Sequence, residues 1–117
     1  MSFALVLSPD LMAVSSISSA ARHAGWTLQT IMQPSEMLEK GTADLAILIL
    51  DLAAIKQPLS EIVQQARLVA PGVSVIAFGP HVQGDVLREA ADAGCDLVCT
   101  RGEFMRRLST LFAPIDG

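Results

Sequence analysis

The stretch Leu45-Ala46-Ile47-Leu48-Ile49-Leu50-Asp51 decides the fold of this chain. Six consecutive apolar residues predict a strand that is buried on both faces, because parallel strands covered by helices on both sides show continuous apolar runs. Asp51 interrupts the run far short of the roughly 20 apolar residues that a membrane-spanning helix needs. We therefore expect residues 45–50 to form the central strand of a parallel sheet, with Asp51 at its carboxyl end.

The composition is that of one domain with a large apolar interior. The chain has 117 residues, of which 51% are hydrophobic and only 17% are charged, which excludes an intrinsically disordered protein. Its start has no basic leader and only a brief apolar run, so we expect a cytoplasmic protein with no membrane association. The net charge of −4 and the scattered basic residues argue against a nucleic-acid partner.

Runs of apolar residues, separated by turn residues, lie on either side of the central strand and predict an alternation of strands and helices. Further strands are expected at residues 3–7, 73–78 and 96–99, with a more polar edge strand at 26–31. Helices are expected at residues 11–24, 34–40, 59–70, 85–92 and 104–112, with Gly25 and Gly94 as caps and residues 53–58 as a loop. The inward face of the first helix is predicted to carry Leu11, Val14, Ile17, Ala20, Ala21 and Ala24.

Five strands alternating with five helices predict an α/β fold in one domain, residues 1–117. The right-handed crossovers of such units give a three-layer (βα)5 doubly wound parallel sheet of five strands. Ligands of these sheets bind at the carboxyl ends of the strands. Candidate functional residues are therefore expected in the loops that follow residues 7, 31, 50, 78 and 99.

Several kinds of site are excluded at these loops. Ser8-Pro9-Asp10 after the first strand lacks the glycines that bring a backbone close to a dinucleotide pyrophosphate. The segment from Gly79 to Gly84 has the glycine spacing of a phosphate-binding loop but continues with Asp85 instead of a lysine. We therefore expect no nucleotide cofactor.

The cysteines and histidines do not form a recognisable catalytic or metal motif. Cys95 and Cys99 are expected to be buried, reduced thiols, because they do not have CxxC spacing. A structural zinc site would require both of them to meet His23 and His81, which we do not expect. We predict that the chain is not an enzyme and holds no metal.

An acidic pair, Asp10 and Asp51, remains at the expected strand ends. With an aspartate closing the third strand at this chain length, the sequence resembles the CheY-like receiver domain of bacterial response regulators over nearly its whole length. The segment from Gly94 to Phe104 follows the Gly-Ala-x-x-Φ-Φ-x-Lys-Pro-Φ pattern of that family, with Arg101 at the lysine. The resemblance implies the flavodoxin-like strand order 2-1-3-4-5.

The resemblance also implies a chemistry, and most of its residues are missing here. The family phosphorylates the aspartate after the third strand, which matches Asp51 or, in a shifted register, the slot of Ile49. Its two magnesium-binding acids fall on Ser8 and Pro9, with only Asp10 close by. Its switch Ser or Thr falls on Gly79 and its lysine on Arg101. The sequence thus resembles a degenerate pseudo-receiver, in which Mg²⁺ would bind Asp10 and Asp51 only if the chemistry survived.

Each of these residues also has a structural interpretation. Asp51 could cap the turn or helix after its strand, and Asp10 could cap the first helix. Arg101 is either a solvated cation or a partner of Asp51. His81 is either a solvated loop residue or a contact for a ligand or partner. Arg101, Arg106 and Arg107 together are interpreted as surface cations.

Three functions follow as hypotheses. The favoured one is a phosphorylation-independent interaction module that binds a protein partner or forms a homodimer. The resemblance places that interface on the fourth helix, fifth strand and fifth helix, near Cys95, Arg101, Arg106 and Arg107. The second is a working receiver that is phosphorylated on Asp51. The third is a small-molecule or anion sensor that uses the Gly79-Pro80-His81 loop and the start of the fourth helix.

Overall fold

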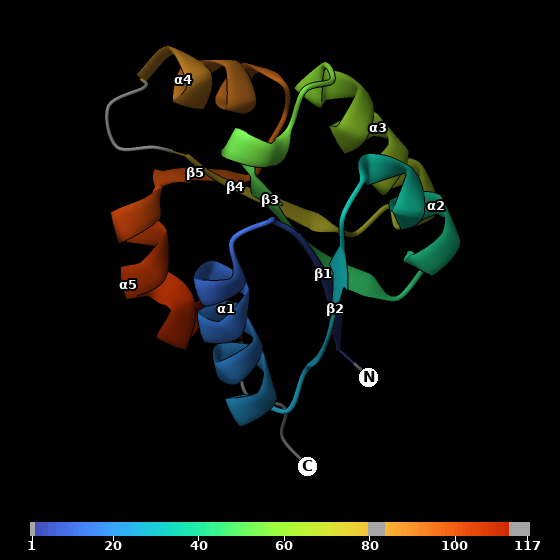
Figure 1. Cartoon of the computed structure of the whole chain (residues 1–117). Helices are drawn as coiled ribbons and strands as arrows, with labels where there is room; N and C mark the ends of the chain where they lie inside the picture. The colour runs from blue at the N-terminus through green and yellow to red at the C-terminus, as the bar shows by residue number, and fades with distance from the viewer. Residues whose placement is uncertain (1, 80–83, 113–117) are drawn as a thin grey trace.

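The computed structural model describes residues 2–79 and 84–112, and its five strands form one parallel sheet in the order β2-β1-β3-β4-β5 (Figure 1). The predicted fold class and strand order are confirmed. The strands are β1 (Phe3–Leu7), β2 (Thr27–Ile31), β3 (Leu45–Asp51), β4 (Ser74–Gly79) and β5 (Leu97–Thr100). The helices are α1 (Leu11–His23), α2 (Met37–Lys40), α3 (Leu59–Val69), α4 (Gly84–Asp92) and α5 (Arg101–Leu111). Two 3-10 turns, η1 (Pro34–Glu36) and η2 (Leu52–Ala54), precede α2 and α3.

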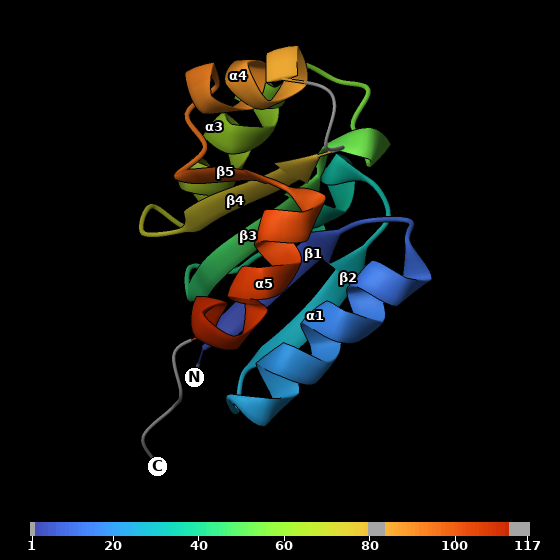
Figure 2. The ribbon, with the colours of Figure 1, turned by 90° about the vertical axis from the view of Figure 1, so that its left-hand side faces the viewer.

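Helices cover both faces of the sheet: α1 and α5 lie on one face, and α2, α3 and α4 on the other (Figures 1 and 2). Alternate residues of each inner strand enter two separate hydrophobic clusters, because successive side chains point to opposite faces. Leu48 and Leu50 pack toward α3, whereas Ile47 and Ile49 pack toward α1 and α5. This two-sided burial is the reason that β3 is a continuous apolar run.

Strand boundaries differ from the predicted ones by about one residue. β2 begins at Thr27 rather than at residue 26, β5 runs from Leu97 to Thr100, and β3 includes Asp51. β1 and β3 also shift register, since Phe3 faces Leu45 but the next residue, Ala4, faces Ile47. In the segment predicted to be a loop after β3, the first residues form η2.

The first helix confirms its predicted caps but not its predicted inward face. Gly25 has φ 85° and allows the Trp26 amide to donate to the Ala21 carbonyl, which closes the helix end. Ala13, Ile17 and Ala21 are buried, as a spacing of four residues requires on one helix face. Leu11, in contrast, is 84% exposed, because the first turn of α1 projects beyond the edge of the sheet. The prediction that it faces inward was wrong.

The fourth helix ends as predicted. Gly94 has φ 101°, and the Cys95 amide donates to the Ala90 carbonyl in the same type of cap. Gly41 after α2 has an ordinary φ of −77°, so its role is different. A Cβ there would lie 2.5 Å from the Met37 carbonyl oxygen, so only glycine permits this close approach. Among the described residues, no helix is long and apolar enough to span a membrane.

Candidate functional site

Asp51 lies at the carboxyl end of the central strand, and only 2% of its surface is exposed. The Ser8 hydroxyl donates to Asp51 Oδ2 over 2.7 Å, and the Ala53 amide donates to Oδ1 over 3.1 Å. The second of these bonds makes Asp51 the N-cap of η2, as its structural interpretation predicted. Ile49, two residues earlier on the same face, lies inside the hydrophobic cluster and not at the edge. Asp51 is therefore the acidic group that β3 brings to the candidate site.

Asp10 caps the first helix, which also confirms its structural interpretation. Its Oδ1 accepts hydrogen bonds from the Met12 and Ala13 amides, at 2.9 and 3.2 Å. The Ala13 amide is the main reason that the pKa of Asp10 is lowered from 3.8, and its bond with Arg101 contributes in the same direction. Asp10 is thus a carboxylate at neutral pH, held by the backbone on one side.

Arg101 joins the two carboxylates. Its Nη1 donates to Asp10 Oδ2 over 2.6 Å, and its Nη2 lies 3.6 Å from Asp51 Oδ2. The guanidinium also lies 5.5 Å from the centre of the Phe78 ring, within the range of a cation–π interaction. Arg101 is the first residue of α5, where the helix dipole disfavours a cation. The two carboxylates and the ring offset that cost, so Arg101 is the counterion of both carboxylates, although 41% of its side chain is exposed.

Three residues around Arg101 were not among the predicted site residues: Thr100, Glu103 and Phe78. Thr100 is the N-cap of α5: its hydroxyl accepts from the Glu103 amide, while Glu103 accepts from the Thr100 amide. The Thr100-x-x-Glu103 spacing is a capping-box signal that could have predicted this helix start. These bonds lower the pKa of Glu103 below 4.5, mainly through the Thr100 amide. Phe78, in turn, stacks on Phe104 with ring centres 4.5 Å apart, which fixes the ring beneath Arg101.

The residues at this edge do not fit a magnesium ion. Mg²⁺ requires near-octahedral oxygen ligands, usually from carboxylates and water. At the two positions where the resemblance implies acids, the Ser8 hydroxyl donates a hydrogen bond to Asp51, and Pro9 offers no side-chain oxygen. The Arg101 guanidinium is bonded to Asp10 and approaches Asp51, so it occupies the position between the two carboxylates. Among the described residues, no group of three or more Asp, Glu, His or Cys could hold a metal.

Gly79, at the position of the switch hydroxyl, lies in a tightly packed environment. A Cβ on Gly79 would lie 3.2 Å from Leu52 Cδ1 and 3.3 Å from Leu87 Cδ2. Side chains from η2 and α4 therefore cover the end of β4. A hydroxyl-bearing residue would fit here only if these leucines moved.

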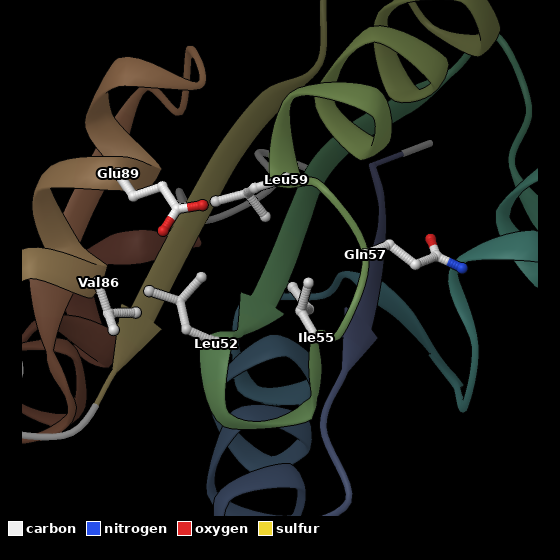
Figure 3. Close-up of a pocket in the computed structure, with 6 residues that line it drawn as sticks. All are labelled: Leu52, Ile55, Gln57, Leu59, Val86 and Glu89. Carbon is white, nitrogen blue, oxygen red and sulfur yellow. The ribbon is translucent and has the colours of Figure 1, made fainter.

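A small cavity lies beside this packing, between η2 and α4. Its volume is about 70 Å³, and it is lined by Leu52, Ile55, Gln57, Leu59, Val86 and Glu89 (Figure 3). Leu52 and Val86 point toward each other across it, whereas Gln57 points away. Pockets for small organic ligands usually measure roughly 300–1,000 Å³. The cavity is too small for a nucleotide or a similar ligand.

Among the remaining predicted residues, the structure describes Cys95, Cys99, Arg106 and Arg107. Both cysteines are free thiols; Cys99 is buried, as expected, whereas Cys95 is only half-buried. Burial raises the pKa of Cys95 to about 11 and also raises the pKa of Cys99. Arg106 and Arg107 are exposed on α5, as expected for surface cations. Pro80 and His81, in the loop assigned to the sensor hypothesis, lie outside the described residues.

Comparisons with known proteins identify the fold but not a close relative. No protein-family model matches the sequence, and no curated protein matches it. A response-regulator receiver domain from Clostridium thermocellum superimposes with a TM-score of 0.71 at 18% identity, over 94% of this chain and 90% of that one. The phosphorylated cyanobacterial phytochrome response regulator RcpA gives 0.73 at 11% identity, over 93% and 89%. The chain therefore has the CheY-like receiver fold.

A further structural neighbour carries a different description. A putative pilus assembly-related protein from Burkholderia pseudomallei superimposes with a TM-score of 0.67 at 18% identity, over 99% of this chain and 95% of that one. Proteins with this fold thus include one that is not described as a response regulator. Because a fold does not define a function, the function must be argued from the site.

Proposed function

We propose that this protein is a phosphorylation-independent interaction module built on the receiver fold. One observation carries the proposal: both oxygens of the Asp51 carboxylate are already bonded inside the protein. Ser8 and Ala53 donate to them, and the Arg101 guanidinium lies beside Oδ2. An aspartate held in this way is a structural element of the sheet edge rather than a nucleophile.

Phosphorylation of Asp51 would meet three obstacles. The carboxylate is 2% exposed, so an attacking geometry requires the Ser8 contact to open first. The acyl phosphate would carry about two negative charges in place of the single charge of the carboxylate, next to Asp10. Arg101 supplies one positive charge, which the two carboxylates already share. Without a divalent cation, that charge would remain uncompensated.

The proposal extends to the class of activity and to the compartment. A site whose acids are neutralised internally supports binding rather than catalysis, so we propose no enzymatic activity and no cofactor. The free thiols Cys95 and Cys99 are consistent with a reducing compartment, which favours the cytoplasm. The surface of α4, β5 and α5, with Arg106 and Arg107 exposed, is the interface that the resemblance implies for a protein partner or a second copy.

The test is incubation with acetyl phosphate and Mg²⁺, followed by intact-protein mass spectrometry. The matched control is Asp51→Asn, and a receiver domain known to accept phosphate from acetyl phosphate confirms that the reagent is active. We expect no phosphoryl adduct on the wild type. An adduct that forms on the wild type and is absent from Asp51→Asn would show a working receiver and reject the proposal.

The oligomeric part of the proposal needs a separate measurement. Light scattering coupled to size exclusion over the micromolar range reports the molar mass directly. An increase of the molar mass with protein concentration would show self-association. If Arg107→Glu reduces this increase, the interface lies on α5. A constant monomeric mass would reject the homodimer and leave a different protein as the partner.

A further inference from the structure

A groove lies between α1 and α5. These two helices cover the face of the sheet opposite to α2, α3 and α4 (Figure 2). The volume of the groove is about 780 Å³. On α1 its lining extends from Ser15 to Ala24, which corresponds to about 14 Å along a helix axis. The groove is therefore open, elongated and about as long as two to three helical turns.

The sequence of α1 explains why the two helices leave a groove. The α1 wall consists of short side chains, among them Ser15, Ser16, Ser19 and Ala20, which fill little of the space between the helices. The α5 wall carries larger apolar side chains, including Met105 and Leu108. Helices pack at axial distances of roughly 8–10 Å that depend on side-chain size, so a wall of serines and alanines permits the close approach of another helix.

The charge of this face differs from that of the whole protein. α1 and α5 contain four basic residues, Arg22, Arg101, Arg106 and Arg107, and one acid, Glu103. Arg101 is paired with Asp10 and Asp51, so the other four residues give a net +2. α2, α3 and α4 contain three basic and five acidic residues, which gives −2. The chain as a whole carries −4.

The lining of the groove, like the rest of this face, is basic rather than acidic. His23 and Arg106 contribute to its lining, and no described lining residue is acidic. The Glu103 carboxylate is engaged by the Thr100 amide at the start of α5. An acidic partner would be repelled by the opposite face and attracted to this one.

We propose that the groove between α1 and α5 binds an amphipathic helix of a partner protein, with an apolar stripe along the groove and acidic residues beside Arg106 and His23. This inference rests on the proposed role as an interaction module and names the kind of partner. The groove shares α5 and Arg106 with the α4–β5–α5 interface, but it lies on the side of α5 that faces α1, and it does not involve Asp51. Helix-in-groove recognition of this kind takes its affinity from apolar anchors and its selectivity from the charged rim.

The protein contains its own reporter for this groove. Trp26 is the only tryptophan of the chain, and its ring packs edge-on against Phe112, with ring centres 5.3 Å apart. Phe112 lines the groove. A ligand that settles between α1 and α5 should therefore change the emission of Trp26.

The experiment uses synthetic helical peptides of 14 residues that lack Trp and Tyr, a length of roughly 21 Å that covers the groove. All share the same Leu and Ala stripe, and their outer positions are Glu, Gln or Lys. We expect the Glu peptide to change Trp26 emission saturably and to bind about three- to tenfold more tightly than the Gln peptide. The Lys peptide should bind most weakly, and the difference should shrink at high salt.

Two charge reversals on the same helix give matched variants. Arg106→Glu should lower the affinity for the Glu peptide about three- to tenfold. Arg107 does not line the groove, so Arg107→Glu should change that affinity less than twofold. Circular dichroism checks that both variants are folded. Ser19→Phe is a second test that leaves the charge unchanged. Its larger side chain should fill the groove and prevent binding of the Glu peptide.

Two results would overturn the inference. The first is that the Glu peptide does not bind, or binds no better than the Lys peptide. The second is that Arg106→Glu and Arg107→Glu lower the affinity for the Glu peptide equally. Failure of the proposed function would instead appear as a phosphoryl adduct on Asp51 in mass spectrometry, so the two failures are distinguishable.

Discussion

Replacing Arg101 with Gln should lower the free energy of unfolding by about 2 kcal/mol, because the buried Asp51 carboxylate would lose its neighbouring cation. The charged atoms lie 3.6 Å apart. At an effective dielectric constant of 20, this separation corresponds to a gross attraction of ~4–5 kcal/mol. The Arg101 side chain is 41% exposed, so water screens part of that attraction. Ser8 and Ala53 still bond to the carboxylate, which also limits the loss.

A double-mutant cycle separates the Asp51 contribution from the rest of Arg101. Asp51→Asn removes the charge and keeps an oxygen acceptor for the Ser8 hydroxyl. In that background, Arg101→Gln should cost at least ~1 kcal/mol less than in the wild type. The contact of Arg101 with Asp10 is lost in both arms of the cycle and therefore cancels.

The assay is thermal unfolding followed by circular dichroism, with urea unfolding as a second measurement. For a chain of 117 residues, a loss of about 2 kcal/mol corresponds to a decrease in Tm of roughly 8 °C. Arg107→Gln, an exposed arginine on the same helix, is the control and should change Tm by no more than about 2 °C. An equal loss in the wild-type and Asp51→Asn backgrounds would refute the counterion role of Arg101.

The remaining predictions concern packing, pH and thiol reactivity. Gly79→Thr should destabilise the fold by about 1–3 kcal/mol through its contact with Leu52, measured by urea unfolding, and Gly79→Ala should cost less. Because the pKa values of Asp10 and Glu103 are lowered in the folded state, their stabilisation is complete above their ordinary values of 3.8 and 4.5 and is lost as the pH falls further. A Tm profile from pH 6 to about pH 2.5 should show this decrease, and Glu103→Gln should make it shallower; an unchanged slope would count against the capping box. Cys95, with a pKa of about 11, should be only ~0.1% thiolate at pH 8 and should react with a disulfide reagent far more slowly than a free thiol, a rate that unfolding in urea would restore.

The fold was predictable because its signals are local and repeated. The apolar run before Asp51 identified a strand buried on both faces, and Gly25 and Gly94 marked helix ends where only a left-handed residue closes the cap. The exposure of Leu11 was not predictable in this way. Periodicity gives the spacing of a helix face, but the position of the first turn relative to the sheet edge depends on how the helix docks.

The site was predictable only in part. The sequence placed Asp10, Asp51 and Arg101 at one edge, because carboxyl ends of parallel strands share an edge. Local sequence patterns did not predict which of these side chains form hydrogen bonds with each other. Ser8 and Asp51 are 43 residues apart, and their contact depends on the register between β1 and β3. The spacing of Thr100 and Glu103, in contrast, is a local signal from which a capping box could have been predicted.

The bond between Asp10 and Arg101 has a consequence for how the protein folds. It closes a loop of 91 residues and joins the start of the first helix to the start of the last. Contacts of such long sequence separation pay a large loop-closure entropy, and they form late when the intervening strands must pair first. During synthesis, β1, β3 and β4 can emerge and associate before Arg101 exists. We therefore expect Arg101 to reach Asp10 and Asp51 in the final step of folding. Formation of this ion pair would then report that the sheet is complete.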